Sequence, residues 1–258
     1  MRAKKSYGQH FLNNEHYAAN IAAGLELTDQ YERVLEVGPG QGFLTKHLLE
    51  RRDDFELTVI DADRDMAHHI KRNFKELEGR IILKDFLKLK MAEEFDGEFG
   101  LIGNFPYNIS SQIMFKMMDN YRMIPEMVGM FQKEVADRIL AGPGSKTYGV
   151  LGVLVQARYS GKLMFNVGRG NFSPPPKVQS AVIRCERLPE PLVPDEHYGN
   201  YKRVVKAAFN QRRKMMRNSL KGILPSEQLM DDEFFQRRPE QVSVAEFVEL
   251  AMQLEVRN

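Results

Sequence analysis

The 258-residue chain has a single cysteine, Cys185, and no tryptophan. One cysteine excludes an internal disulfide and any metal site built on several thiolates, and a reducing cytoplasm is the expected setting. The longest apolar run, residues 148–155, is far shorter than the roughly 20 residues that a membrane-spanning helix needs. No apolar core follows the basic N-terminus, so it is not a secretory signal. We expect a cytoplasmic protein without a membrane segment or a bound metal.

Net charge is also small, because 37 Lys and Arg residues oppose 35 Asp and Glu residues. The distribution is uneven, however: residues 198–226 hold eight basic residues and no acidic one. Such a block favours a polyanionic partner, because neutralising phosphates releases counterions. The alternative is a solvated helix face, which is the commoner meaning of a charge run. The absence of acids for i,i+4 pairs, and the mutual repulsion within residues 211–214, argue for an anionic partner.

The first two thirds of the chain alternate short β-rich runs with amphipathic stretches. This alternation indicates βαβ units and a parallel sheet that is covered on both faces. Two later strands are expected to form an antiparallel end of the same sheet. The expected strands are residues 33–37, 57–61, 80–83, 99–103, 126–131, 162–167 and 178–187, and the expected helices are 43–51, 64–77 and 110–121.

A proline-rich segment separates this part from the rest. Residues 188–194 contain three prolines in seven residues, which is typical of a linker. The pattern beyond it is helical, over residues 198–209, 215–223 and 244–254. The sequence therefore predicts an α/β domain over residues 1–188 and a small all-helical domain over residues 189–258.

A glycine loop follows the first predicted strand. Gly38, Gly40 and Gly42 have the spacing G-x-G-x-G, which lets the backbone turn tightly and approach a ligand at a helix N-terminus. The nicotinamide fingerprint is G-x-G-x-x-G, and here Phe43 occupies the place of its third glycine. The glycines alone could serve only to shape a βα turn. Further acidic residues on the same sheet edge favour a bound nucleoside.

Those acids end the next two strands. Asp61 lies 19 residues after Gly42, where a carboxylate can accept both ribose hydroxyls, and Asp85 is placed to bind an adenine amino group. This arrangement resembles the class I S-adenosylmethionine-dependent methyltransferases, whose first motif, E-x-G-x-G-x-G, begins here at Glu36. The resemblance implies a Rossmann-like domain that binds S-adenosylmethionine through Glu36, Gly38, Gly40, Asp61 and Asp85.

The fourth strand runs into Asn104, Phe105, Pro106 and Tyr107, which fit the (N/D)-x-P-(Y/F) pattern of methyltransferases that act on exocyclic amines. The lone pair of an aryl amine is delocalised into its ring, so the nitrogen is a poor nucleophile. The Asn104 side-chain oxygen and the Phe105 carbonyl can accept the amino hydrogens and localise that lone pair. Pro106 fixes the backbone and Tyr107 offers a stacking face. A simple turn after a strand is the alternative.

A target base must leave its stack to reach such a site. Phe172, in the proline-rich residues 171–180, is expected to stack on the face of the base opposite Tyr107. The alternative is that Phe172 belongs to the core of a stiff connection.

With these motifs the chain resembles the ribosomal RNA adenine N6,N6-dimethyltransferases, in particular their small-subunit branch. Residues 5–12 resemble the family opening K-x-F-G-Q-N-F-L, and residues 208–214 resemble its basic C-terminal segment. The resemblance implies that His10 and Leu12 line the methionine end of the cofactor and that Asn104 bridges cofactor and amine. The residues expected to contact RNA are Lys4, Lys5, Lys177, Arg212, Arg213, Lys214 and Arg217.

The implied substrate is a pair of adjacent adenosines near the 3′ end of 16S rRNA in the small ribosomal subunit, each methylated twice by a monomeric enzyme that takes part in subunit biogenesis. Three residues depart from the family pattern: His10 replaces Asn, Phe105 replaces Leu and Asp61 replaces Glu. None of these changes removes a needed function.

Four other functions compete with this interpretation. They are an erythromycin-resistance dimethylase of large-subunit rRNA, a mainly non-catalytic checkpoint factor of ribosome assembly, a DNA adenine methyltransferase and a nicotinamide enzyme. The run of residues 104–111, the loop of residues 172–180 and the length of the C-terminal domain favour the small-subunit enzyme.

Overall fold

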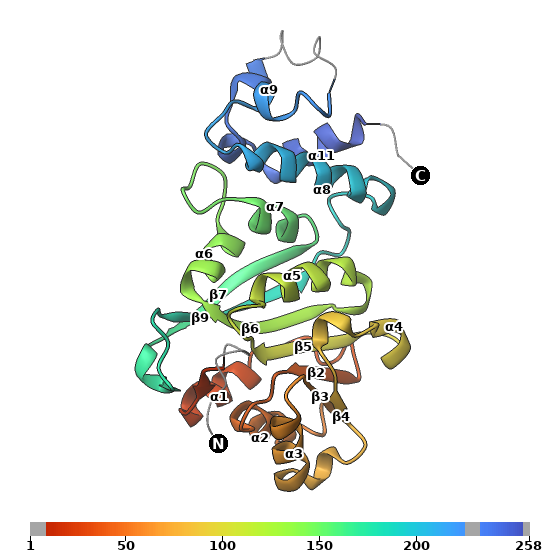
Figure 1. The fold of residues 1–258 in the computed structure, drawn as a ribbon. Helices are drawn as coiled ribbons and strands as arrows, with labels where there is room; N and C mark the ends of the chain where they lie inside the picture. The colour runs from red at the N-terminus through yellow and green to blue at the C-terminus, as the bar shows by residue number, and fades with distance from the viewer. Residues whose placement is uncertain (1–8, 225–232, 255–258) are drawn as a thin grey trace. The chain divides into compact units, whose positions relative to one another are not determined.

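The computed structural model describes residues 9–224 and 233–254, so the predicted RNA contacts Lys4 and Lys5 lie outside the described residues. The chain divides into two compact units (Figure 1). The first comprises residues 1–136 and 161–187, and the second comprises residues 137–160 and 188–258. The helix α6 (Lys133–Leu140) and the strand β7 (Tyr159–Val167) carry the chain from one unit to the other.

The first unit is built on a seven-stranded sheet in the order β4-β3-β2-β5-β6-β9-β7. The neighbours from β4 to β6 pair in parallel, whereas β6 and β9 pair antiparallel, as the sequence predicts. The strands of this sheet besides β7 are β2 (Arg33–Val37), β3 (Glu56–Asp61), β4 (Ile81–Leu83), β5 (Phe99–Asn104), β6 (Glu126–Gln132) and β9 (Ser180–Arg187). The chain winds from β2 outward through β3 and β4, then returns to the other side of β2 with β5. The carboxyl ends of β2 and β5 therefore form a topological switch point, where open α/β sheets bind ligands.

Helices cover this sheet. A core cluster joins buried residues of α1, α2 and α3, such as Ile21, Leu48 and Ile70, to sheet residues such as Val34 and Ile102. The helices of this unit are α1 (Glu15–Ala22), α2 (Phe43–Leu49), α3 (Arg64–Asn73), α4 (Met91–Glu94) and α5 (Ser110–Asp119), with 3-10 turns at Lys75–Leu77, Phe86–Lys88, Tyr121–Met123 and Arg169–Asn171.

A second, two-stranded sheet was not predicted. Its strand β1 (Phe11–Leu12) pairs antiparallel with β8 (Phe172–Ser173), which joins the N-terminal segment to a segment about 160 residues later in the chain. Two residues per strand leave no periodicity for sequence reasoning to detect.

The second unit is helical. Its helix α8 (Asp195–Asn210) packs against α7 (Val150–Gln156), α9 (Met216–Ser219) and α11 (Val244–Met252), and short 3-10 turns lie at Glu233–Gln236 and Pro239–Gln241. The Tyr201 hydroxyl of α8 donates a hydrogen bond of 2.8 Å to the Val153 carbonyl of α7. No described helix has the length and apolarity needed to cross a membrane.

The division between the units differs from the predicted boundary at residue 188. Residues 137–160, assigned by sequence to the first domain, pack with the C-terminal helices. The reason is the apolar run that ends at Val155. This run forms most of α7 and is buried against α8, so the segment belongs with the helical unit that covers its apolar side chains. The helix expected over residues 215–223 is also shorter, since only Met216–Ser219 is helical and a turn follows at Gly222.

One buried carboxylate ties the first unit together. The fully buried Glu126 of β6 accepts hydrogen bonds from the backbone N–H groups of Glu26 and Leu27, from the Tyr31 hydroxyl and from the Arg184 guanidinium of β9. These partners come from the segment after α1 and from the antiparallel strand. The Glu126 carboxylate and burial together raise the pKa of Tyr31, with burial the larger cause.

We predict that Glu126→Gln destabilises the protein by about 3 kcal/mol, because an amide presents a donor to groups that are themselves donors and leaves Arg184 without its buried counter-charge. Urea unfolding followed by circular dichroism measures the change. The control is Glu186→Gln, which removes one of the two solvent-exposed carboxylate partners of Arg184, at 3.5 Å, and is expected to cost less than about 1 kcal/mol. Equal losses in the two variants would contradict the central role of Glu126.

Candidate active site at the switch point

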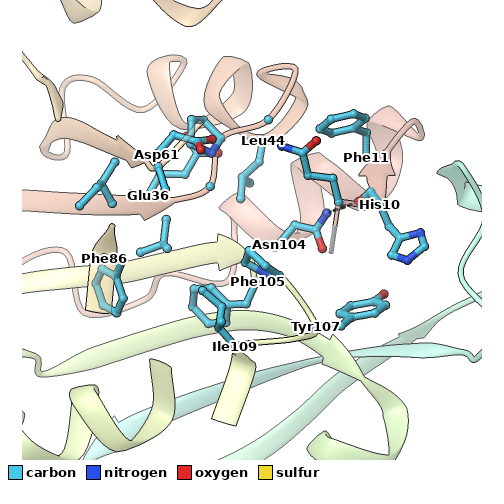
Figure 2. A pocket seen from close by; sticks show the side chains of 18 of the residues that line it. His10, Phe11, Glu36, Leu44, Asp61, Phe86, Asn104, Phe105, Tyr107 and Ile109 are labelled. Carbon is cyan, nitrogen blue, oxygen red and sulfur yellow. Dashed lines mark hydrogen bonds between the residues drawn. The ribbon is translucent and has the colours of Figure 1, made fainter. Parts of the chain in front are cut away.

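A cavity of about 270 Å³ opens at the carboxyl edge of the parallel strands (Figure 2). Its wall is formed by the N-terminal segment, the glycine loop after β2, the ends of β3 and β5, and the turn after β4. It brings together all of the cofactor and catalytic residues that the sequence predicts. These are His10, Leu12, Glu36, Gly38, Gly40, Asp61, Asp85, Asn104, Phe105, Pro106 and Tyr107.

The glycine loop requires its glycines for two reasons. Gly40 and Gly42 have positive φ angles of 56° and 86°, a region that other residues rarely adopt. They also lie against rings: a Cβ at Gly40 would be 2.9 Å from the Phe11 ring, and one at Gly42 would be 2.3 Å from the Phe74 ring. The loop is thus clamped between the N-terminal segment and the end of α3, and it forms a fixed wall.

Two acids lie beside the loop, of which Glu36 is buried and Asp61 is half-buried. Glu36 of β2 is 1% exposed and accepts a hydrogen bond of 2.7 Å from the Thr45 hydroxyl of α2. Burial raises the pKa of Glu36 to about 8. Burial is also the main reason that the pKa of Asp61, at the end of β3, rises to about 6. Within the described residues, neither acid has a Lys or Arg ion-pair partner, so burial rather than a counter-charge governs the protonation of both.

Asp85 also lines the cavity. Its carboxylate accepts the Leu87 backbone N–H at 2.9 Å and so begins the 3-10 turn Phe86–Lys88. Phe86 and Leu87 line the cavity next to it. A polar acceptor beside apolar side chains suits a planar, partly polar group.

The predicted catalytic motif starts at the last residue of β5. The Asn104 side-chain N–H donates a hydrogen bond of 2.9 Å to the His10 backbone carbonyl, which fixes the amide orientation because a carbonyl can only accept. The Phe105 N–H donates to the Met130 carbonyl of β6 at 3.2 Å. Among the residues that the structure describes, none donates a hydrogen bond to the Asn104 Oδ1 or to the Phe105 carbonyl. Two adjacent acceptors are therefore unused.

The Phe105 ring is buried, with 1% of it exposed. It lies 5.2 Å from the Phe131 ring and over Gly103 and Gly129, where a Cβ would approach it to 2.8 and 2.4 Å. This packing sets the path of the backbone that carries the Phe105 carbonyl.

Tyr107 is held at both its hydroxyl and its ring. The hydroxyl is 2.5 Å from the Ser180 Oγ at the start of β9, and burial raises its pKa. The ring stacks on the imidazole of His10, with centroids 5.4 Å apart and an angle of 30° between the planes. Sequence reasoning missed Ser180 as a contact of Tyr107, because the two residues are 73 positions apart.

The predicted role of Phe172 is not compatible with the structure. Phe172 is 3% exposed and belongs to the core cluster together with Leu12, Ile21 and Val167. Its place in β8 opposite Leu12 directs it into that cluster, so it cannot stack on a base without leaving the core. The alternative, a core residue in a stiff connection, is the correct one.

The predicted RNA contacts that the structure describes lie on two segments. Lys177 is exposed after the β8 strand, and Arg213, Lys214 and Arg217 are exposed after α8. Arg212 is half-buried and donates a hydrogen bond of 3.2 Å to the Ser145 carbonyl within the second unit. No described cluster of His, Cys, Asp or Glu could hold a metal ion.

Comparison with known proteins shows the family of the chain. The family model described as "Ribosomal RNA adenine dimethylase" matches residues 1–251. A protein of Cytophaga hutchinsonii, named ribosomal RNA small subunit methyltransferase A, is 46% identical over 254 residues, which cover 98% of each chain. A protein of Parabacteroides distasonis with the same name is 49% identical over 257 residues, 98% of this chain and 94% of that one.

Two solved structures show the same fold. A dimethyladenosine transferase from Plasmodium falciparum has a TM-score of 0.78 at 23% identity, over 95% of this chain and 97% of that one. The 23S rRNA methyltransferase ErmE has a TM-score of 0.68 at 24% identity, over 93% and 99%. The fold is that of the class I methyltransferases, and the chain belongs to the ribosomal RNA adenine dimethylase family.

Proposed function

We propose that this protein transfers methyl groups from S-adenosylmethionine to the N6 amino groups of two adjacent adenosines near the 3′ end of small-subunit rRNA, two groups to each. The curated relatives with this length and identity have small-subunit names. The observation that carries the chemistry is the pair of unused acceptors, the Asn104 Oδ1 and the Phe105 carbonyl, at the edge of the cavity. The likeness to ErmE supports the fold alone and does not favour a large-subunit substrate.

The residues that line the cavity fit S-adenosylmethionine. Asp61 and Asp85 supply carboxylate acceptors beside apolar wall residues such as Phe86, which suits a ligand with hydroxyl and amino donors and an aromatic ring. Asp61 would hold the ribose hydroxyls and Asp85 the adenine amino group, while the glycine loop would lie against the methionine end. When bound, this cofactor supplies an electrophilic methyl group on a positively charged sulfur.

The motif residues act on the target amine. The two acceptors bind the two amino hydrogens, which turns the nitrogen toward a tetrahedral geometry and localises its lone pair toward the methyl donor. After the first transfer the nitrogen sheds its extra proton to water and keeps one hydrogen, which one acceptor can still hold. The second transfer therefore needs no new group, and no strong general base is required for either.

The basic segment after α8 would bind the RNA, and Lys177 would add a contact beside the site. Arg213, Lys214 and Arg217 are exposed and available for phosphates, whereas Arg212 is engaged in part with Ser145. We place the reaction in the cytoplasm, with the protein acting as a monomer on the small ribosomal subunit.

The test is methyl transfer from labelled S-adenosylmethionine to purified, undermethylated 30S subunits, with 50S subunits and naked DNA as parallel substrates and digestion of the product to nucleosides. N6,N6-dimethyladenosine from 30S subunits alone is expected. The same product from 50S subunits would assign the protein to the resistance dimethylases. Tight subunit binding without any transfer would favour a checkpoint factor.

In this assay Asn104→Ala is expected to lower kcat by about a hundredfold to a thousandfold, because the loss removes one preorganised acceptor from the reacting amine. Single-turnover rates measure the effect. The control is Asn73→Ala on the exposed side of α3, which should react at the wild-type rate. A loss of less than fivefold for Asn104→Ala would contradict the assigned role.

The affinity for S-adenosylmethionine should weaken as the pH falls through about 6. The ribose hydroxyls would donate to the charged form of Asp61. Burial raises the pKa of Asp61 to about 6, so below that pH the carboxyl is protonated and the charged acceptor is lost. Calorimetric titrations between pH 5 and 7 should show this trend. The Asp61→Asn variant should bind S-adenosylmethionine more weakly, and its affinity should not change with pH over this range. If the pH dependence survives this substitution, Asp61 is not its source.

Charge reversal at Arg213 should weaken binding of 30S subunits and reduce the slope of log Kd against log salt by about 1, since one phosphate contact is lost. Affinity for S-adenosylmethionine should not change. Arg52→Glu, an exposed arginine of the first unit, is the matched control. Equal slopes for Arg213→Glu and the wild-type protein would remove the segment after α8 from the RNA interface.

A further inference from the structure

The His10 side chain lines the cavity beside Tyr107, in the part that the proposed function assigns to the target base. Its imidazole stacks on the Tyr107 ring at 5.4 Å between centroids, and its Nδ1 is 2.8 Å from the Pro174 carbonyl. Because that carbonyl can only accept, the Nδ1 carries the hydrogen. The ring is thus held by one stack and one hydrogen bond, at the end of the cavity formed by the amine-binding motif.

The face of Tyr107 that His10 covers is the one on the side of Asn104. The backbone carbonyl of His10 itself accepts the hydrogen bond from the Asn104 amide. Figure 2 shows the His10 and Asn104 side chains on the same side of the Tyr107 ring. A base that stacked on this face would have its amino group within reach of Asn104.

No base fits between the two rings as they stand. Stacked rings are separated by about 3.5 Å, so an intervening base would require about 7 Å between the outer rings, more than the 5.4 Å found. One ring must therefore move. Tyr107 is pinned through its hydroxyl to Ser180, which is fully buried at the start of β9. His10 is only half-buried, and its imidazole is anchored by a single hydrogen bond.

We propose that the His10 imidazole is a residue of the target-base site: it occupies the stacking face of Tyr107 when no base is bound, and the entering adenine displaces it. The proposal rests on the proposed function and gives His10 a role other than the cofactor contact that the family resemblance implies. The Tyr107 ring exchanges the imidazole for the adenine as its stacking partner, so its apolar face stays covered throughout. The hydrogen bond between Asn104 and the His10 carbonyl involves the backbone and can persist while the ring turns away.

Histidine-selective NMR of the full chain tests the displacement directly. The protein contains six histidines, and the signal that is lost in His10→Asn identifies residue 10. In the free protein, the His10 ring protons should be shifted upfield by the Tyr107 ring, and the ¹⁵N shifts should report hydrogen on Nδ1. Tyr107→Leu should abolish the upfield shift. A His10 signal without that shift in the free wild-type protein would overturn the proposal.

The probe for the base is adenosine 5′-monophosphate at millimolar concentration, added in the presence of S-adenosylhomocysteine. The His10 signal should then move to its position in Tyr107→Leu. A signal that stays upfield while the nucleotide binds would show that the base uses another face, and would overturn the proposal. If S-adenosylhomocysteine alone displaces the signal, His10 is a cofactor contact, and this result would also overturn the proposal.

Steady-state kinetics on undermethylated 30S subunits give the second readout. His10→Ala should lower the KM for subunits about two- to tenfold, because the base no longer competes with a stacked ring, and should leave the KM for S-adenosylmethionine unchanged. His10→Asn should behave in the same direction and guards against a folding defect in the alanine variant. A raised KM for subunits would mean that the ring helps to bind the base instead of competing with it, and would overturn the proposal. Failure of the wild-type protein to methylate any subunit would refute the proposed function, whereas the NMR result stands by itself.

Discussion

The in-register parallel pairing of β2 with β3 and β5 is the constraint on which the site depends. In this pairing Val37 is opposite Ile60 and Glu36 is opposite Ile102, so the three strands end at nearly the same level. The glycine loop follows β2 directly, and Asp61 and Asn104 are the last residues of β3 and β5, so all three are brought to one edge of the sheet. A register shift of one residue in either pair would turn side chains to the other face and separate the loop from its acids.

The burial of acids at this edge has an energetic consequence. Glu36 and Asp61 are desolvated without a cationic partner among the described residues, and burial raises the pKa of each. Ligand hydroxyl groups that donate hydrogen bonds to the Asp61 carboxylate would offset part of this desolvation cost. The clamped glycine loop and the Thr45 hydroxyl on Glu36 keep the acids from turning toward solvent.

The N-terminal segment connects the side of the cavity that we assign to the cofactor to the side that we assign to the base. The pairing of β1 with β8, the contact of His10 with Pro174 and the Asn14–Asn171 hydrogen bond of 2.7 Å hold this segment against residues 171–174. Phe11 packs over the glycine loop while His10 covers Tyr107. A displacement of this short segment would therefore change both ends of the cavity, because the neighbouring residues His10 and Phe11 contact opposite ends.

The sequence by itself determined the parallel sheet with its antiparallel end, the glycine loop, the acids at the strand ends and the motif from Asn104 to Tyr107. Each is a local signal, since hydrophobic period, glycine spacing and strand-end residues are read within a few positions. Tertiary structure alone decided the rest. It placed Phe172 in the core, Ser180 against the Tyr107 hydroxyl, His10 on the Tyr107 ring and residues 137–160 in the helical unit. These outcomes depend on which distant segment covers an apolar side chain or meets a polar one, and a single sequence does not encode that pairing in any local pattern.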